Sequence, residues 1–207
     1  NVQFGEGGAG AFSDGKLGTG THDRRIAWVL RTLVEHGAKP SITYDAKPHL
    51  GTDVLSRVVV NIRREIEALG GELRFRTRLD GLDIRGGELR GIRLSSEGTD
   101  EYLSTNRLIL ATGHSARDTF KMLLEAGLPL EPKAFSMGAR IEHLQAEIDL
   151  AQYGAPRGKR LPAADYGLNV HLPDGRGVYT FCMCPGGVVI NAASEPGGVV
   201  TNGMSWS

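Results

Sequence analysis

Residues 105–113, which read Thr-Asn-Arg-Leu-Ile-Leu-Ala-Thr-Gly, indicate the fold class. Leu108 to Ala111 are continuously apolar, as expected of a strand that is buried on both faces of a sheet. The run ends in the glycine turn Thr112-Gly113-His114. Ser115 and Asp118 are then spaced like a capping box, which predicts a helix running to Gly127. A buried strand followed by a turn and a helix predicts an α/β fold.

An antiparallel meander is predicted just upstream of this strand. Leu82-Asp83-Ile84 and Ile92-Arg93-Leu94 flank Arg85-Gly86-Gly87-Glu88, whose paired glycines suit the positive φ angles of a tight hairpin turn. A third arm passes through Tyr102 and Leu103. We therefore expect three neighbouring strands joined by short turns.

Two amphipathic helices are predicted before the meander. Apolar residues keep helical spacing from Ile26 to Val34, and Gly37 ends the run. A second helix begins at Thr52, which is expected to be its N-cap, and it continues to Gly70-Gly71. Both helices are expected to bury one apolar stripe.

Residues 73–79 alternate between apolar side chains and the arginines Arg74, Arg76 and Arg78. A period of two predicts a strand with one buried and one solvated face. The arginine stripe is interpreted as the solvated face, and a phosphate-binding patch is the less favoured reading.

The N-terminal stretch Asn1–Leu17 is rich in glycine, and residues 5–10 match the G-x-G-x-x-G dinucleotide fingerprint. That fingerprint opens a helix, whereas Gly15, Gly18 and Gly20 here disfavour an early helix. A plain flexible loop is one alternative to the fingerprint. A loop wrapped around a ligand is favoured, because glycines let backbone N–H groups approach a bound anion. We expect residues 5–17 to be extended or irregular.

Composition excludes several classes of partner. The chain has 207 residues, with 24 Lys and Arg against 24 Asp and Glu, so its formal net charge is zero. No bulk electrostatic attraction favours nucleic acid or an anionic membrane surface. Neither a signal peptide nor an apolar run of membrane-spanning length occurs, and a cytoplasmic location is expected. A first residue other than Met and an open C-terminal end indicate an internal fragment.

The order of these elements resembles the flavoproteins of the glutathione-reductase-like superfamily. Residues 70–79 are similar to the strand whose end meets the adenine, and residues 105–113 are similar to the buried strand that ends in an Ala-Thr-Gly turn. Four blocks also resemble a bacterial group of FAD-dependent dehydrogenases, in this order along the chain: Asn1–Leu17, Ala46–Asp53, Gly113–Asp118 and Phe181–Gly187.

This resemblance implies FAD as the cofactor. It implies a partial FAD-binding domain over residues 1–127, without the ADP-binding βαβ unit. A partial, β-rich substrate domain of mixed α+β structure is implied over residues 128–207. The implied cofactor-binding residues are Gly5, Glu6, Gly7, Gly8, Ala9, Gly10, Ser13, Lys16, Leu17, Leu79, Ala111, Thr112 and Gly113.

Four further residues are candidates for catalysis. Arg140 and His143 lie on or beside a strand-like segment, Met137 to Ile141, where an arginine suits an anionic substrate and a histidine transfers protons near neutral pH. A solvated strand end is an equal alternative. His49 precedes a helix N-terminus, where anions bind well, and a simple helix-entry turn is the alternative.

Cys184 is the fourth candidate, as a redox or flavin-facing thiol, and a structural thiol is the favoured alternative. Cys182 and Cys184 would point to opposite faces of a strand, which is poor geometry for a disulfide. They also lack the second pair of ligands that a metal site needs, so no metal is expected. Downstream, Val188-Val189-Ile190 and Val199-Val200 favour strands joined by glycine turns.

Two classes of function follow. The first is an FAD-dependent oxidoreductase that acts on a small-molecule substrate, with an anionic substrate and NAD(P)H or another electron partner as expectations. The second is a non-catalytic α/β nucleotide-binding or scaffold domain.

Overall fold

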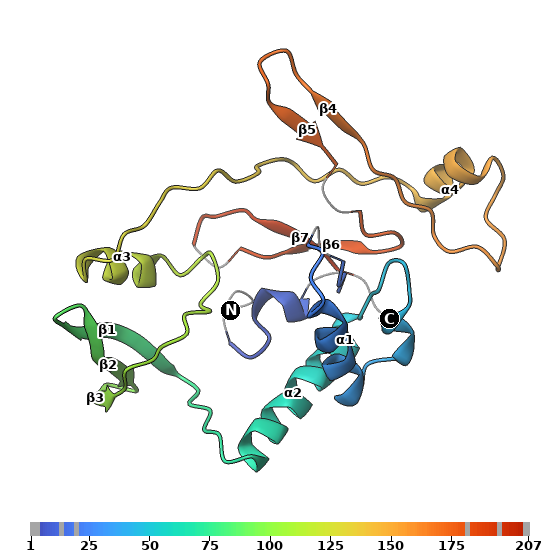
Figure 1. Ribbon diagram of the computed structural model, residues 1–207. Coiled ribbons are helices and arrows are strands. Elements are labelled where there is room, and N and C mark those ends of the chain that lie inside the picture. Colours follow the sequence, from blue (N-terminus) through green and yellow to red (C-terminus); the bar gives the residue numbers. More distant parts are fainter. Residues whose placement is uncertain (1–4, 13–14, 19–20, 181–182, 194–195, 205–207) are drawn as a thin grey trace. The chain divides into compact units, whose positions relative to one another are not determined.

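The computed structural model describes residues 5–12, 15–18, 21–180, 183–193 and 196–204. The chain divides into two compact units, of which the first joins Asn1–Leu69 to Ala139–Ser207 and the second is Gly70–Gly138. Helices and antiparallel sheets occur together (Figure 1), which confirms the α/β fold class. These units differ from the domains expected to meet near Leu128, and that boundary stays a prediction.

Four helical segments form the N-terminal half of the first unit. They are the 3₁₀ helix η1 (Gly8–Phe12), α1 (Ile26–Glu35), η2 (Pro40–Thr43) and α2 (Thr52–Ala68). Both predicted amphipathic helices are confirmed. The predicted N-cap is wrong by one position, because Gly51 occupies it and no side chain caps the helix. Asp53 lies in the first turn, where its charge favours the positive end of the helix dipole.

The core of this unit lies between η2 and the start of α2. Ile42 and Leu50 are each only 2% exposed, and Val58 is completely buried. Apolar side chains of α1 and α2 pack against this cluster, namely Leu30, Leu33, Val34, Leu55 and Ile62. The predicted apolar stripes of α1 and α2 are thus the helix faces that pack against a common core.

The second unit contains the predicted meander. Its strands are β1 (Thr77–Arg85), β2 (Glu88–Ser96) and β3 (Thr99–Ser104), which pair antiparallel in the order β1-β2-β3. Gly86 and Gly87 have φ of 60° and 80°, as the hairpin turn requires. The helix α3 (Arg117–Glu125) contacts β1.

The arginine-rich strand begins later than predicted. Residues 73–76 precede β1, and Arg76 has a φ of 54°, which interrupts extended backbone. Arg74, Arg76 and Arg78 are nevertheless exposed and paired with carboxylates, those of Glu72 and Glu101, Glu97, and Asp80 respectively. The solvated reading of these arginines is therefore confirmed, although only Arg78 lies in the strand.

The buried strand predicted at Leu108–Ala111 is wrong for this chain. The segment has no regular secondary structure, and Ile109 is 92% exposed. A strand is stable only when neighbouring strands satisfy its backbone groups, and no strand within the described residues pairs with this one. The predicted capping box is also wrong, because Ala116 is the N-cap of α3 and no side chain caps this helix.

The C-terminal half of the first unit contains α4 (Gln145–Tyr153) and two hairpins. The hairpins are β4 (Asn169–His171) with β5 (Gly177–Tyr179), and β6 (Val188–Asn191) with β7 (Thr201–Met204). The strand expected at Val188–Ile190 is confirmed. Val199 and Val200 instead precede β7, whose register pairs Asn191 with Thr201.

The strand-like segment expected at Met137–Ile141 has no regular secondary structure. Met137 is 86% exposed and Ile141 is 74% exposed, so alternation of apolar residues did not produce a sheet here. Among the helices that the structure describes, none has the length and apolar character to cross a membrane.

Candidate functional site

A turn formed by residues 183–187 gathers several of the predicted site residues within the first unit. We refer to Met183, Cys184, Pro185, Gly186 and Gly187 as the 183–187 turn. The Gly187 N–H donates to the Cys184 carbonyl at 3.0 Å, and Gly186 has a φ of 69°. The turn leads directly into β6.

Cys184 and Arg140 meet at Gly203 on the neighbouring strand β7. A Cβ built on Gly203 would lie 2.4 Å from Cys184 Sγ and 3.2 Å from Arg140 Nη1. The absence of a side chain at Gly203 thus lets a thiol and a guanidinium approach the same point of the hairpin. Cys184 is half-buried and is not part of a disulfide. Cys184 lies in irregular chain and not on the predicted strand, whereas Cys182 is outside the described residues.

Lys16 reaches the turn from the N-terminal part of the chain, and His49 lies beside Lys16. They form an isolated antiparallel bridge, in which the Leu17 N–H donates to the Pro48 carbonyl at 3.0 Å. The Lys16 ammonium donates to the carbonyl of Met183, next to Cys184. The fold therefore links two predicted site residues, Lys16 and His49, with the turn that carries a third.

Gly15 makes this approach possible. The backbone at Gly15 lies so close to Leu50 that a Cβ at Gly15 would stand 1.5 Å from the Leu50 carbonyl oxygen. Gly15 also has a φ of 70°, which side-chain-bearing residues rarely adopt. The sequence pattern had marked Gly15 only as a residue that disfavours an early helix.

The glycine-rich loop packs onto α2. Gly5, Gly7 and Gly8 have φ of 102°, 79° and 53°. The Glu6 carboxylate pairs with Arg63 of α2 at 2.7 Å, and both side chains are about three-quarters buried. A Cβ on Gly7 would lie 2.9 Å from that of Ala11.

The expected irregular loop is interrupted by η1, which is a 3₁₀ helix of 5 residues. It is not the longer α-helix that opens at a dinucleotide fingerprint. Gly8, Ala9 and Gly10 lie in η1, whereas Leu17 is half-buried beside the core cluster. Ser13 lies outside the described residues.

A buried polar cluster that the sequence analysis missed supports the turn. The Gly186 N–H donates to Gln145 Oε1 at 3.0 Å, and Gln145 Nε2 donates to Asp149 Oδ1 at 2.8 Å. Asp149 is only 4% exposed. Its pKa lies below the ordinary value, chiefly because the Ala164 N–H donates to it, and Gln145 and Arg157 add further hydrogen bonds. The i,i+4 spacing of Gln145 and Asp149 on a helix was the available signal.

His143 lies apart from the contacts of the turn. Its Nε2 is 2.8 Å from the Tyr166 hydroxyl, the two ring centroids are 5.9 Å apart, and its side chain is exposed. Within the described residues, no group of three or more His, Cys, Asp and Glu side chains is arranged to hold a metal ion.

The remaining cofactor candidates belong to the second unit. Leu79 is half-buried and pairs with Leu94 across β1 and β2. Ala111, Thr112 and Gly113 are exposed. Gly113 has a φ of 79°, and a Cβ built on it meets no atom within 4 Å. Its backbone is therefore open to a ligand in this unit.

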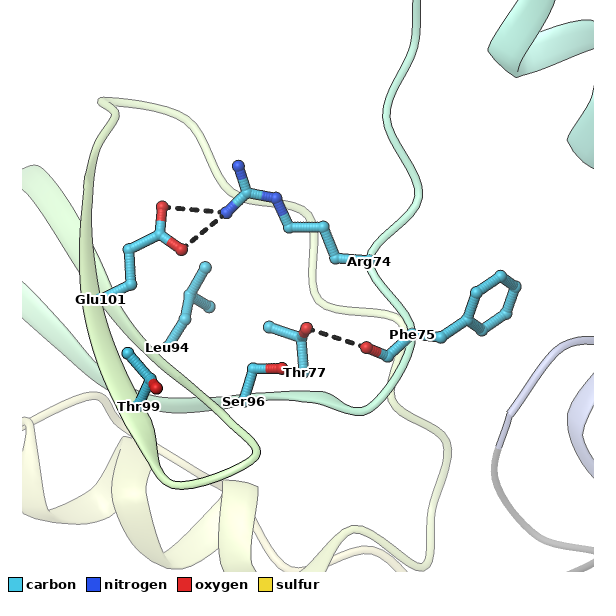
Figure 2. A pocket seen from close by; sticks show the side chains of 7 residues that line it. All are labelled: Arg74, Phe75, Thr77, Leu94, Ser96, Thr99 and Glu101. Carbon is cyan, nitrogen blue, oxygen red and sulfur yellow. Dashed lines mark hydrogen bonds and ion pairs between the residues drawn. The ribbon is translucent and has the colours of Figure 1, made fainter.

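The second unit also has a shallow hollow of about 350 Å³ on the meander. Figure 2 shows Arg74 reaching across it to Glu101, while the Phe75 ring points away. The Arg74 Nη1 atom lies 2.9 Å from both Glu101 carboxylate oxygens. Hydrogen bonds to Glu72 and then Glu101 raise the pKa of Arg74, and the same pairing lowers that of Glu72. Because its cation is already neutralised, this hollow is a poor anion site.

Comparison with known proteins relates the C-terminal part of the chain to flavoproteins. The model of the family described as "FAD-dependent protein, C-terminal domain-like" matches residues 134–207. An uncharacterized protein of Clostridium beijerinckii (strain ATCC 51743 / NCIMB 8052) is 49% identical over 208 residues, which cover 100% of this chain. The chain spans 38% of the length of that relative. These similarities support a relation to an FAD-dependent protein family.

Proposed function

We propose that this chain is part of an FAD-dependent oxidoreductase of the dehydrogenase type. The observation that carries the proposal is the similarity of residues 134–207 to an FAD-dependent protein domain, because this segment contains Arg140, Gly203 and the 183–187 turn. Lys16, which follows the glycine-rich loop, reaches the same turn. The proposal thus assigns the first unit both cofactor-facing and substrate-facing residues.

The glycine-rich loop has the properties of a cofactor cradle. Gly5 and Gly10 have no atom within 4 Å of a built Cβ, so their backbone is open on that side. Successive N–H groups in such loops bind phosphate oxygens, and the Lys16 ammonium adds a positive charge. In the second unit, the open backbone at Gly113 is the corresponding candidate. FAD, when bound, supplies the electron-transfer chemistry.

Residues at the 183–187 turn, together with two histidines outside it, are proposed to handle the substrate. Arg140 is an exposed guanidinium suited to an anionic substrate group. His49 and His143 are proton-transfer candidates near neutral pH, and Cys184 offers a thiol beside Arg140. NAD(P)H or another electron carrier is the proposed redox partner.

A visible absorption spectrum of the purified complete gene product tests the proposal. Oxidised flavin bands that bleach on addition of dithionite, with FAD released on denaturation, are expected. Lys16→Met should lower the flavin content, whereas Lys39→Met, at an exposed position beyond α1, should not. Absence of flavin after reconstitution with FAD would instead favour the alternative, a non-catalytic nucleotide-binding or scaffold domain.

A further inference from the structure

Asp149 is a buried carboxylate that accepts hydrogen bonds from three donors. Its Oδ1 accepts from the Ala164 N–H at 2.9 Å and from Gln145 Nε2 at 2.8 Å, and its Oδ2 accepts from Arg157 Nε at 2.9 Å. Burial of a carboxylate is unfavourable unless it is paired and hydrogen-bonded. The three donors meet that requirement.

These contacts also determine how the Gln145 amide is oriented. Its Nε2 donates to Asp149 Oδ1 and to the Ala164 carbonyl, the latter at 3.0 Å. An amide nitrogen has two N–H donors, so both are engaged. A rotated amide would place its oxygen against two acceptors. The oxygen is consequently held toward the Gly186 N–H, which donates to it at 3.0 Å.

Gly186 lies two residues after Cys184 in the same turn. The Gly187 N–H bond is internal to the turn, while Lys16 supports it at Met183. The amide of Gln145 joins the second half of the turn to α4.

We propose that Asp149 is a positioning residue for Cys184 and acts through Gln145. The carboxylate orients the amide, the amide holds the Gly186 N–H, and the turn then keeps the thiol at Gly203 beside Arg140. A catalytic use of this placement rests on the proposed function, whereas the placement itself does not.

The test measures the rate at which iodoacetamide alkylates Cys184 in the complete gene product, in a Cys182→Ser background, by mass spectrometry. Gln145→Met keeps the length of the side chain but removes the acceptor for Gly186. It should raise the alkylation rate by about tenfold, the equivalent of one lost hydrogen bond. Asp149→Leu, which removes the Oδ1 acceptor of Gln145, should raise the rate similarly, and the double variant should add little, because both changes break one path.

Arg157→Met is the matched control, since Arg157 contacts Asp149 Oδ2 and not the Gln145 amide. It should leave Cys184 reactivity within about twofold of the unaltered protein while lowering stability, because buried ion pairs depend on both partners. Equal effects of Arg157→Met and Asp149→Leu would overturn the proposal in favour of a general structural role. Unchanged alkylation in Gln145→Met would overturn it as well, and this variant keeps the Asp149–Arg157 ion pair if Asp149→Leu fails to fold. Flavin content of the same samples reports separately on the proposed function.

Discussion

Gly15 is a residue whose missing Cβ determines a long-range contact. A side chain there would overlap the Leu50 carbonyl oxygen, and the positive φ adds strain. We expect Gly15→Ala to destabilise the first unit by about 1–3 kcal/mol from the φ strain alone, and the overlap adds to this. Gly18→Ala should have little effect, because φ at Gly18 is not positive and a built Cβ meets no atom within 4 Å. Urea unfolding of the two variants compares them, and equal midpoints would contradict the assignment.

Gly113 offers a residue-scale test of the proposed cofactor contact in the second unit. Its φ of 79° nearly equals that of Gly127, 81°, and neither has an atom within 4 Å of a built Cβ. Backbone strain should therefore be similar in Gly113→Val and Gly127→Val. If Gly113 faces FAD, only its variant should lose flavin in the complete gene product. Absorbance of the folded variants measures this, and equal flavin content would remove Gly113 from the site.

At the scale of elements, the first unit depends on the packing of α1, η2 and α2 on one small core. Leu50 and Leu69 lie just before and just after α2, but Leu50 is 2% exposed and Leu69 is 80% exposed. Leu50→Ala should lower the free energy of unfolding by about 2–5 kcal/mol, the usual range for buried leucines. Leu69→Ala should change it by less than about 1 kcal/mol. Similar losses in a denaturation series would contradict the core described for this unit.

The Asp149 carboxylate joins α4 to Arg157 and Ala164, and its pKa is lowered in the folded state. Such a group stabilises the fold above its unfolded pKa, about 3.9, and this contribution is lost as pH falls through the lower folded value. We therefore expect the Ala164 amide resonance to be constant from about pH 7 to pH 5 and to shift only below about pH 4. Asp149→Asn should abolish this acid transition. A transition that begins above about pH 5 would show that Asp149 is not held as described.

At the scale of the whole molecule, we expect the 207-residue chain alone to bind FAD weakly. Affinity depends on donors that are held in place before binding, and Ile109 in the segment expected to pack beside the cofactor is 92% exposed. The Clostridium beijerinckii relative is considerably longer than this chain, which covers 38% of its length. FAD titration of this chain and of the complete gene product, followed by fluorescence, separates the cases. Tight one-to-one binding by the chain alone would show that the cofactor site needs no residues beyond these 207.

Local features were predictable because they depend on neighbours in sequence. The apolar period specified α1 and α2, and paired glycines specified the β1–β2 turn. The same reasoning was wrong for residues 108–111 and 137–141, because apolar residues form strands only where a partner strand satisfies their backbone groups. Such a partner is a property of the surrounding structure and cannot be read from the segment itself.

The sequence by itself determined which residue types the candidate site has, since glycines, Lys16, Arg140 and Cys184 stand out by their chemistry. Only the tertiary structure decided which of them meet. It linked Lys16 to Met183, 167 positions away, and placed Cys184 and Arg140 at Gly203. It also paired His143 with Tyr166. It placed Gln145 in contact with both Gly186 of the turn and Asp149. The physical reason is that burial and hydrogen bonding between distant segments depend on how the chain packs, whereas helix period and turn preference depend only on adjacent residues.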